Sequence, residues 1–414
     1  MDKLNSRHLI FIILGTCIVS YKTYPNIIVQ CGRRDSWIAV SIASIFLILY
    51  AIYTLRIFIK TKCYDLYNIY TSALGKNLGS IFYILFIFTL FLTLVESASV
   101  EANSMHQNMI LETPTWFILL LFIITTAYCV KKGLRPLIIT TIAGMFFVML
   151  AGTNLGILTQ KYKDNKYLYP ILQWGFDKNM IIATLRSLAL YGPISILFPY
   201  LNNIVDKHRI IKTSLVGILI VVQMQIYSLI GVVTTFGYKK ALTIYYPKLI
   251  QTQLVSHFDF LEAGELFVML QIVGGWFIKY ILTFYAFLKL IEIFYNKKKS
   301  TAILVISILV FILSHFTSKN GFLMLKLLVI YNYIVLINFI IIPAIIFTIY
   351  SARVSNNESN KYESQDKYSK KENSEDAKVL KSKTNLNSEK SLTVYNDKYL
   401  LPQTIEKQKN KMLN

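Results

Sequence analysis

Residues 180–202 read MIIATLRSLALYGPISILFPYLN, an apolar stretch interrupted at its centre by Tyr191-Gly192-Pro193. About 20 apolar residues in an α-helix are enough to cross the hydrocarbon core of a bilayer. Proline removes a backbone donor and clashes with the preceding helical turn, and glycine relaxes the chain beside it. The stretch therefore predicts a membrane-spanning helix that is broken near its middle, a feature typical of transporter-like folds.

Apolar segments of similar length flank this stretch on both sides. With it, they are 9–30, 35–59, 79–105, 114–131, 135–158, 180–202, 211–236, 264–290, 301–316 and 328–351. They predict an all-α, multi-pass membrane domain with ten transmembrane helices over residues 1–352. Residues 353–414 are rich in Lys, Ser, Asn and Glu and poor in aliphatic side chains. Such a segment buries too little apolar surface to fold alone, so we expect a disordered polar cytoplasmic tail.

Composition and charge agree with a membrane protein. The 414-residue chain is 55% hydrophobic and 16% charged, whereas soluble proteins carry about a quarter charged residues. A net charge of +21 would point to nucleic acid in a soluble protein, but here Lys and Arg lie mainly in short loops between apolar segments. The modest excess of Lys and Arg on one side predicts that both termini are cytoplasmic. These basic residues are also expected to attract anionic lipid headgroups, and we expect no nucleic-acid partner.

The chain shows no sign of catalytic or cofactor chemistry. Its four cysteines are widely spaced, without the Cys and His spacing of a zinc site. We find no phosphate-binding loop, no HExxH and no GxSxG motif. We therefore expect neither an enzyme nor a bound metal or cofactor.

Ten spans divide into two sets of five, related as an inverted repeat. Transporters built in this way bind their substrate near the midplane, at breaks in the first helix of each set, here spans one and six. Span one carries Leu14-Gly15-Thr16 in mid-membrane, and span six carries Tyr191-Gly192-Pro193. Freed N–H groups and half-helix ends at such breaks can hold a carboxylate. Each break taken alone is equally compatible with a packing kink.

Ionisable residues within spans are costly and mark candidate sites. Glu96 lies deep in span three. Its helical face also carries Thr93, Ser97, Val100 and Asn103, so we expect that face to point into the bundle. Glu96 could line a ligand site or pair with a buried Lys or Arg. Arg186, one turn before the span-six break, could pair with Glu96 or a ligand, or could extend toward an interface.

Span eight carries the other candidates. Lys279, in its middle, is the better functional candidate. Glu262 and Glu265 at its start match the helix dipole, and Gly274-Gly275 are expected to permit close helix packing. Before this span, residues 237–263 form either an interfacial amphipathic helix or a simple extracellular cap.

Several local patterns in the chain occur in one order over residues 6–351. They are Leu14-Gly15-Thr16, Pro25 and Asp35-Ser36-Trp37-Ile38; Leu74-Gly75-Lys76-Asn77-Leu78-Gly79; Thr113-Pro114; Tyr128 with Lys132-Gly133-Leu134; Leu168-Tyr169-Pro170-Ile171-Leu172 with Gly175; Tyr191-Gly192 and Phe198-Pro199-Tyr200-Leu201; Tyr246-Pro247; and Phe260-Leu261-Glu262 with Glu265 and Lys279. In this set the chain resembles the membrane-embedded B subunit of spore germinant receptors, which is related to amino acid–polyamine–organocation permeases.

The resemblance implies a LeuT-like fold of ten helices, a 5+5 inverted repeat with helices 1 and 6 broken, in the inner membrane of a dormant spore. It also implies a nutrient ligand, typically an amino acid, and two partners: a germinant receptor A subunit and a lipoprotein C subunit.

We weigh three hypotheses: a nutrient sensor, a secondary amino acid transporter coupled to H⁺ or Na⁺, and a subunit that only anchors its partners. For the sensor, Gly15, Thr16, Tyr191 and Gly192 are expected to present backbone groups to the amino acid. Glu96 and Lys279 are expected to line or lock the pocket.

Overall fold

Helices account for almost all of the chain that the structure describes. The structure is a computed structural model, and it describes residues 3–255, 263–294 and 299–354, with the side chains of 263–266 left undescribed. The predicted tail beyond residue 354 lies outside these residues. So does Glu262, and nothing is described of the Glu265 side chain.

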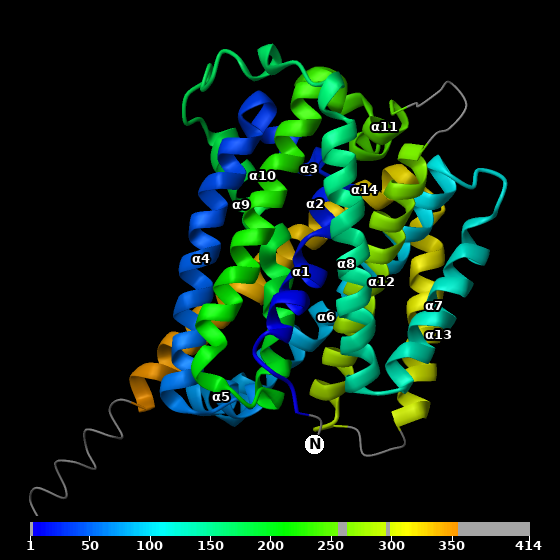
Figure 1. The fold of residues 1–414 in the computed structure, drawn as a ribbon. Coiled ribbons are helices and arrows are strands. Elements are labelled where there is room, and N and C mark those ends of the chain that lie inside the picture. The colour runs from blue at the N-terminus through cyan, green and yellow to red at the C-terminus, as the bar shows by residue number, and fades with distance from the viewer. Residues whose placement is uncertain (1–2, 256–262, 295–298, 355–414) are drawn as a thin grey trace, which may run out of the picture. The chain divides into compact units, whose positions relative to one another are not determined.

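The helices form one bundle with short connections (Figure 1). The longer helices are α4 (Ser36–Thr61), α6 (Lys76–Asn108), α7 (Thr115–Lys131), α8 (Leu134–Leu158), α9 (Lys178–Tyr191), α10 (Ile210–Thr243), α12 (Ala263–Ile291), α13 (Lys299–Ser318) and α14 (Gly321–Val335). Helix α14 continues through a π-helical turn, η6 (Leu336–Ile341), into a helix over 342–354. The first span is made of α1 (His8–Cys17) and α2 (Val19–Thr23), followed by α3 (Asn26–Gly32) and the short 3₁₀ turn η1 (Arg33–Asp35).

Local sequence explains where these helices start and stop. The Asp177 side chain accepts a hydrogen bond from Met180 N at 2.9 Å and caps α9, and the Asn320 side chain caps α14 in the same way. Gly75 (φ 85°) separates α5 (Leu66–Leu74) from α6, and Gly133 (φ 97°) separates α7 from α8. Both glycines adopt a backbone conformation that other residues rarely reach, which permits two tight reversals between packed helices.

Eight helices in the described chain are long and apolar enough to cross a membrane. Two shorter apolar helices, His8–Thr23 and Thr115–Lys131, correspond to the first and fourth predicted spans. The predicted multi-pass helical membrane fold is therefore confirmed, whereas the count of ten spans stays a prediction for these two segments. The last span begins at Gly321, several residues before the predicted residue 328.

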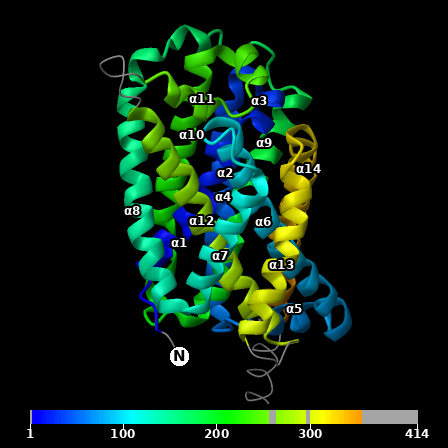
Figure 2. The ribbon, with the colours of Figure 1, turned by 90° about the vertical axis from the view of Figure 1, so that its right-hand side faces the viewer.

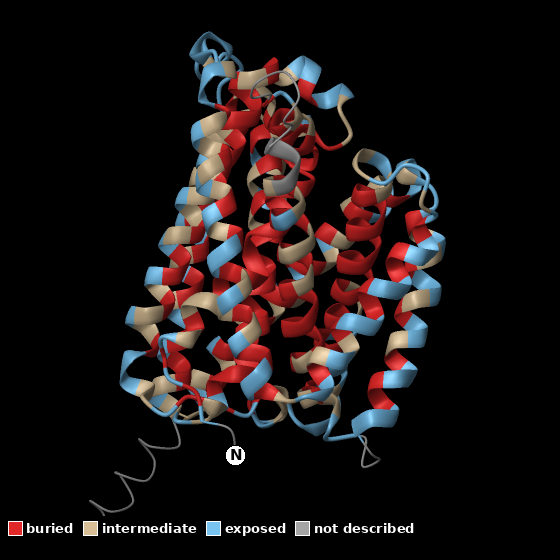
Figure 3. Cartoon of the chain, turned by 45° about the vertical axis from the view of Figure 1, so that its right-hand side comes forward, coloured by how far each residue is buried: buried red, intermediate tan, exposed pale blue. Residues whose placement is uncertain are grey.

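The buried core runs along the middle of the bundle (Figure 3). Helix α12 packs on α6 and α8, α1 packs on α10 and α12, and α4 packs on α9. Figure 2 shows α7, α12 and α13 on one side of the bundle and α8 along one edge. Apolar side chains such as Trp116, Ile139 and Phe146 point outward from the outer helices, which suits contact with lipid chains.

A cap covers the end of the bundle opposite the N-terminus (Figure 1). It contains η2 (Gln160–Tyr162), η3 (Asn165–Leu168) and α11 (Pro247–Gln253). Pro247, Lys248 and Leu249 of α11 are all buried, as are two further residues of this short helix. Of the two alternatives for residues 237–263, the described part is thus a cap packed on the bundle, since an interfacial helix would expose one face.

Candidate functional site

The first span bends at Ile18, between α1 and α2. Ile18 keeps helical dihedral angles (φ −83°, ψ −44°), so the chain bends there without unwinding. Gln225 Nε2, buried in α10, donates to Cys17 O and Ile18 O at 3.0 Å each. One side chain of α10 therefore satisfies two carbonyl groups at the bend.

The sequence predicts a break at Gly15-Thr16. In the structure the bend lies further along the chain, at Ile18. Both residues belong to the regular part of α1, and Thr16 Oγ1 donates to Ile12 O at 2.9 Å. A Cβ atom on Gly15 would lie 2.6 Å from Ile278 Cγ2, too close for any real contact. Gly15 thus allows α1 to pack closely on α12, which explains why a glycine stands in this span.

The second break falls where it was expected. Helix α9 ends at Tyr191, and the chain continues as a 3₁₀ helix, η4 (Gly192–Asn203). Pro193 and Pro199 within this segment lack the N–H groups that an α-helix would need. A Cβ atom on Gly192 would overlap Val335 Cγ1 of α14, so this glycine also makes room for a neighbouring helix.

The two breaks meet inside the bundle. The ring centroids of Tyr21 and Tyr191 are 4.8 Å apart, and Cys17 Sγ lies 3.9 Å from Tyr191 O. The Tyr191 hydroxyl is 3.0 Å from Ser44 Oγ of α4. Spans one and six therefore contact each other at the residues that interrupt them, the arrangement expected for a midplane site.

Beside the breaks lies a buried ion pair. Lys279 Nζ is 2.6 Å from Glu96 Oε2 and 2.9 Å from Oε1, with the two residues 0% and 5% exposed. Ser20 Oγ accepts from Lys279 at 2.8 Å and donates to Glu96 at 3.2 Å, and Tyr24 donates its hydroxyl to Glu96 at 2.5 Å. The network joins α2, α6 and α12, and its donors fully satisfy the carboxylate.

The structure decides between the alternatives that the sequence left open for Glu96 and Arg186. The Glu96 face points into the bundle as predicted, since Thr93, Glu96, Ser97, Val100 and Asn103 are all buried. Arg186 does not pair with Glu96: it donates to Ile27 O at 3.0 Å. Lys279 is the partner, because α12 crosses α6 at the depth of Glu96.

Three contributors were missed by sequence reasoning: Ser20, Tyr24 and Gln225. Ser20 and Tyr24 are four residues apart, a spacing that places both on one helical face and could have marked them as partners of Glu96.

Gly274 and Gly275 permit close packing as predicted, because added Cβ atoms would lie 3.0 Å from Val148 and 2.9 Å from Val19.

The space at the bend is nearly closed. A cavity of about 10 Å³ touches Gly15, Ile18 and Lys22, with Gln271 and Gly275 on its far side. That volume holds at most one water molecule, whereas small-molecule pockets span roughly 300–1,000 Å³. The bend therefore leaves no room for a small-molecule ligand in this structure.

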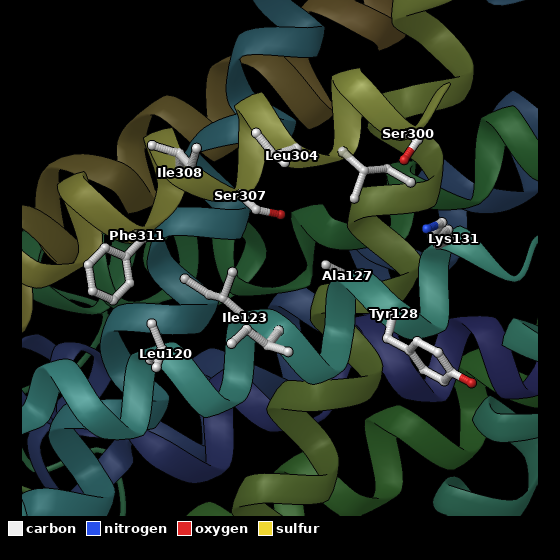
Figure 4. A pocket seen from close by; sticks show the side chains of 12 residues that line it. Leu120, Ile123, Ala127, Tyr128, Lys131, Ser300, Leu304, Ser307, Ile308 and Phe311 are labelled. Atoms are coloured by element: carbon white, nitrogen blue, oxygen red, sulfur yellow. The ribbon is translucent and has the colours of Figure 1, made fainter. Parts of the chain in front are cut away.

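A larger cavity of about 410 Å³ lies between α7 and α13, away from both breaks (Figure 4). Leu120, Ile124, Leu304, Ile308 and Phe311 line most of it, and Lys131 and Ser300 lie at one end. Its apolar lining and outward position suit a lipid chain better than a polar nutrient.

Fold and site together define a multi-pass integral membrane protein of the LeuT-type transporter fold. The structure is similar to that of MhsT in complex with L-phenylalanine, with a TM-score of 0.66, 12% identity, and coverage of 84% of this chain and 89% of the other. It is also similar to a substrate-bound, outward-open Na⁺-coupled sialic acid symporter, with a TM-score of 0.60, 11% identity, and coverage of 81% and 76%. At these identities, the likeness concerns the fold alone.

The family follows from the sequence. Residues 3–323 match the family model described as spore germination protein, and the chain belongs to this family. A relative, spore germination protein XB of Bacillus anthracis, is 24% identical over 310 residues, which cover 73% of this chain and 85% of that protein. The predicted resemblance to spore germination proteins is therefore confirmed.

Proposed function

We propose that this chain is the membrane-embedded B subunit of a spore germinant receptor. It binds a small nutrient, an amino acid, where spans one and six meet, and it signals to an A subunit and a lipoprotein C subunit in the spore inner membrane. In this proposal both termini are cytoplasmic. The observation that carries the proposal is the contact of the two interrupted helices beside the buried Glu96–Lys279 pair.

In this proposal, the nearly closed cavity at the bend links ligand binding to a signal. Ser20 of α2 and Tyr24, the residue after it, are bound to the Glu96–Lys279 pair, so opening the site requires α2 to separate from α6 and α12. An amino acid carries one carboxylate and one ammonium, the same two charges that this pair holds together. A ligand that pairs with them in an open state favours that state, as differential binding requires. Backbone groups at Gly15, Thr16, Tyr191 and Gly192 are the proposed contacts of the ligand's main-chain groups.

The alternative is a secondary amino acid transporter, coupled to H⁺ or Na⁺. Cation coupling by Glu96 would need a carboxylate with free coordination sites, and here its oxygens accept from Lys279, Ser20 and Tyr24. That saturation argues against Glu96 as a cation ligand in this state.

The test uses spores that lack this gene, scanned with single amino acids, sugars and salts. Deletion is expected to abolish germination by one nutrient class, with recovery from the wild-type gene and none from Lys279→Met. Proteoliposomes that hold the purified chain are expected to take up none of that nutrient. An unchanged germination response together with cation-dependent uptake would establish the transporter instead.

A further inference from the structure

A second cavity, of about 370 Å³, adjoins the small cavity at the bend of the first span and shares Lys22 and Gln271 with it. It is enclosed by α2, α8, α10, α11 and α12, toward the capped end of the bundle. Buried polar residues Lys22, Lys248, Gln271 and Ser228 form its inner part, and Ile157 and Tyr227, which are largely exposed, lie at its mouth between α8 and α10. Its volume is within the range of small-ligand sites.

Positive charge gathers in this cavity without a matching negative charge among the described residues. Lys22 and Lys248 are each 8% exposed. The ion pairs of the described chain are Arg33–Asp177 and Lys279–Glu96, and neither includes these lysines. Lys248 Nζ donates to Gln251 at 2.7 Å, whereas Lys22 Nζ meets no hydrogen-bond acceptor within the described segments.

Two glycines show that the polar side chains converge. A Cβ atom added to Gly152 would contact Gln271 Nε2 and lie 3.2 Å from Lys22 Nζ. One added to Gly231 would lie 3.8 Å from Lys248 Nζ and 3.6 Å from Cε of a third lysine, Lys163. Lys163 in turn donates to Tyr227 at the cavity mouth, at 3.0 Å.

Such an arrangement is unfavourable while the cavity holds only solvent. Burial of an ammonium group costs free energy unless an anion or several acceptors compensate. Burial, together with the positive charges of Lys22 and Lys163, lowers the pKa of Lys248 to about 7. A bound anion would remove both penalties.

We propose that this cavity binds an oxyanion, which Lys22 and Lys248 contact in its interior and Lys163 contacts at its mouth. The shared chemistry is a phosphate-type group, carried either by an anionic phospholipid headgroup or by a soluble ion. The mouth between α8 and α10 opens beside apolar side chains, which a lipid could contact with its acyl chains. Because Lys22 belongs to α2, the anion would also hold the half-helix that the midplane site must move.

Thermal unfolding of the full-length chain in nanodiscs tests this site without any germination readout. One arm adds inorganic phosphate to phosphatidylcholine nanodiscs, with chloride at equal ionic strength as the reference. The other arm compares phosphatidylcholine with phosphatidylglycerol nanodiscs. The variants are Lys22→Gln, Lys248→Gln and Gly152→Val, and Lys166→Gln, an exposed lysine of the same cap, is the matched control.

We expect phosphate or phosphatidylglycerol to raise the unfolding temperature of the wild type and of Lys166→Gln. Each Lys→Gln change in the cavity is expected to weaken the apparent affinity about tenfold or more, as loss of one charge-assisted hydrogen bond implies. Without anion, these two variants are expected to unfold at higher temperature than the wild type, because they remove an uncompensated charge. Gly152→Val is expected to lose the anion effect while keeping every charge.

A response to phosphatidylglycerol alone would identify the lipid headgroup, and a response to both additions would identify a site open to soluble anions. Two results would overturn the proposal: no stabilisation of the wild type in either arm, or equal stabilisation of the wild type and all three cavity variants.

Discussion

Lys279 Nζ lies 2.6 Å from Glu96 Oε2, and this contact joins two helices whose residues are 183 positions apart in the chain. Ser20 and Tyr24 add the bent first span to the same network. Trp276 lies against it, with Lys279 Nζ 4.9 Å from its ring centroid. A single charge pair therefore joins α6 to α12 and, through Ser20 and Tyr24, binds the bent first span to both.

Removal of one member of this pair is expected to be strongly destabilising. Glu96→Gln leaves a buried ammonium unpaired and Lys279→Met leaves a buried carboxylate unpaired, so we expect each to cost about 3–5 kcal/mol. The double variant removes both charges, and its cost is expected to be well below the sum of the single costs. Unfolding of all variants in detergent measures this coupling.

The partly exposed pair Arg33–Asp177, 3.9 Å apart, is the control for that cycle. Its removal is expected to change stability far less, because water screens it. Additive effects of Glu96→Gln and Lys279→Met would show that the two residues do not act as one unit.

The bend in the first span depends on one side chain. Gln225→Leu would remove the buried side-chain donor to Cys17 O and Ile18 O, and we expect a loss of about 1–3 kcal/mol. Gln223→Leu, at an exposed position of the same helix, is the control. Equal unfolding temperatures for the two variants would mean that other donors satisfy these carbonyls.

A feature of the fold or the site could be predicted from the sequence only where it depends on a single segment of the chain. Spans and the break at Gly192 are local, because hydropathy and proline act within one segment. The pairing of Glu96 with Lys279, in place of Arg186, depends on how α6 and α12 are rotated against each other, which no single segment encodes. The same applies to Lys22 and Lys248. Each lies in a different element, so no local pattern brings them together.

Gly192 offers a test that separates packing from ligand binding. An added methyl group would overlap Val335 Cγ1, so Gly192→Ala is expected to cost about 1–3 kcal/mol through overpacking. Val335→Ala removes the overlapping atom, and the double variant is expected to recover most of the loss. If germination is also restored in the double variant, the role of Gly192 is packing. If stability recovers while the nutrient response stays lost, the main-chain group at Gly192 belongs to the ligand site.

The pH dependence of anion binding tests the charge of Lys248 directly. Lys22, Lys163 and Tyr227 are the charged or titratable groups that face its cavity from other described elements. The pKa of Lys248 is lowered to about 7 in the folded protein, below its ordinary value of 10.5. The unfolded chain therefore binds more protons between these values, so stability without anion is expected to rise as pH increases from about 7 toward 10.5.

Anion binding is expected to follow the opposite trend, because only the protonated Lys248 attracts an oxyanion. Sulfate is the suitable probe, since its own charge is constant in this range. With a pKa of about 7 for Lys248, its apparent affinity is expected to fall about twofold between pH 6 and 7 and more steeply above pH 7. In Lys248→Met the affinity is expected to be low at every pH, and a decline that persists unchanged in this variant would assign the titration to another group.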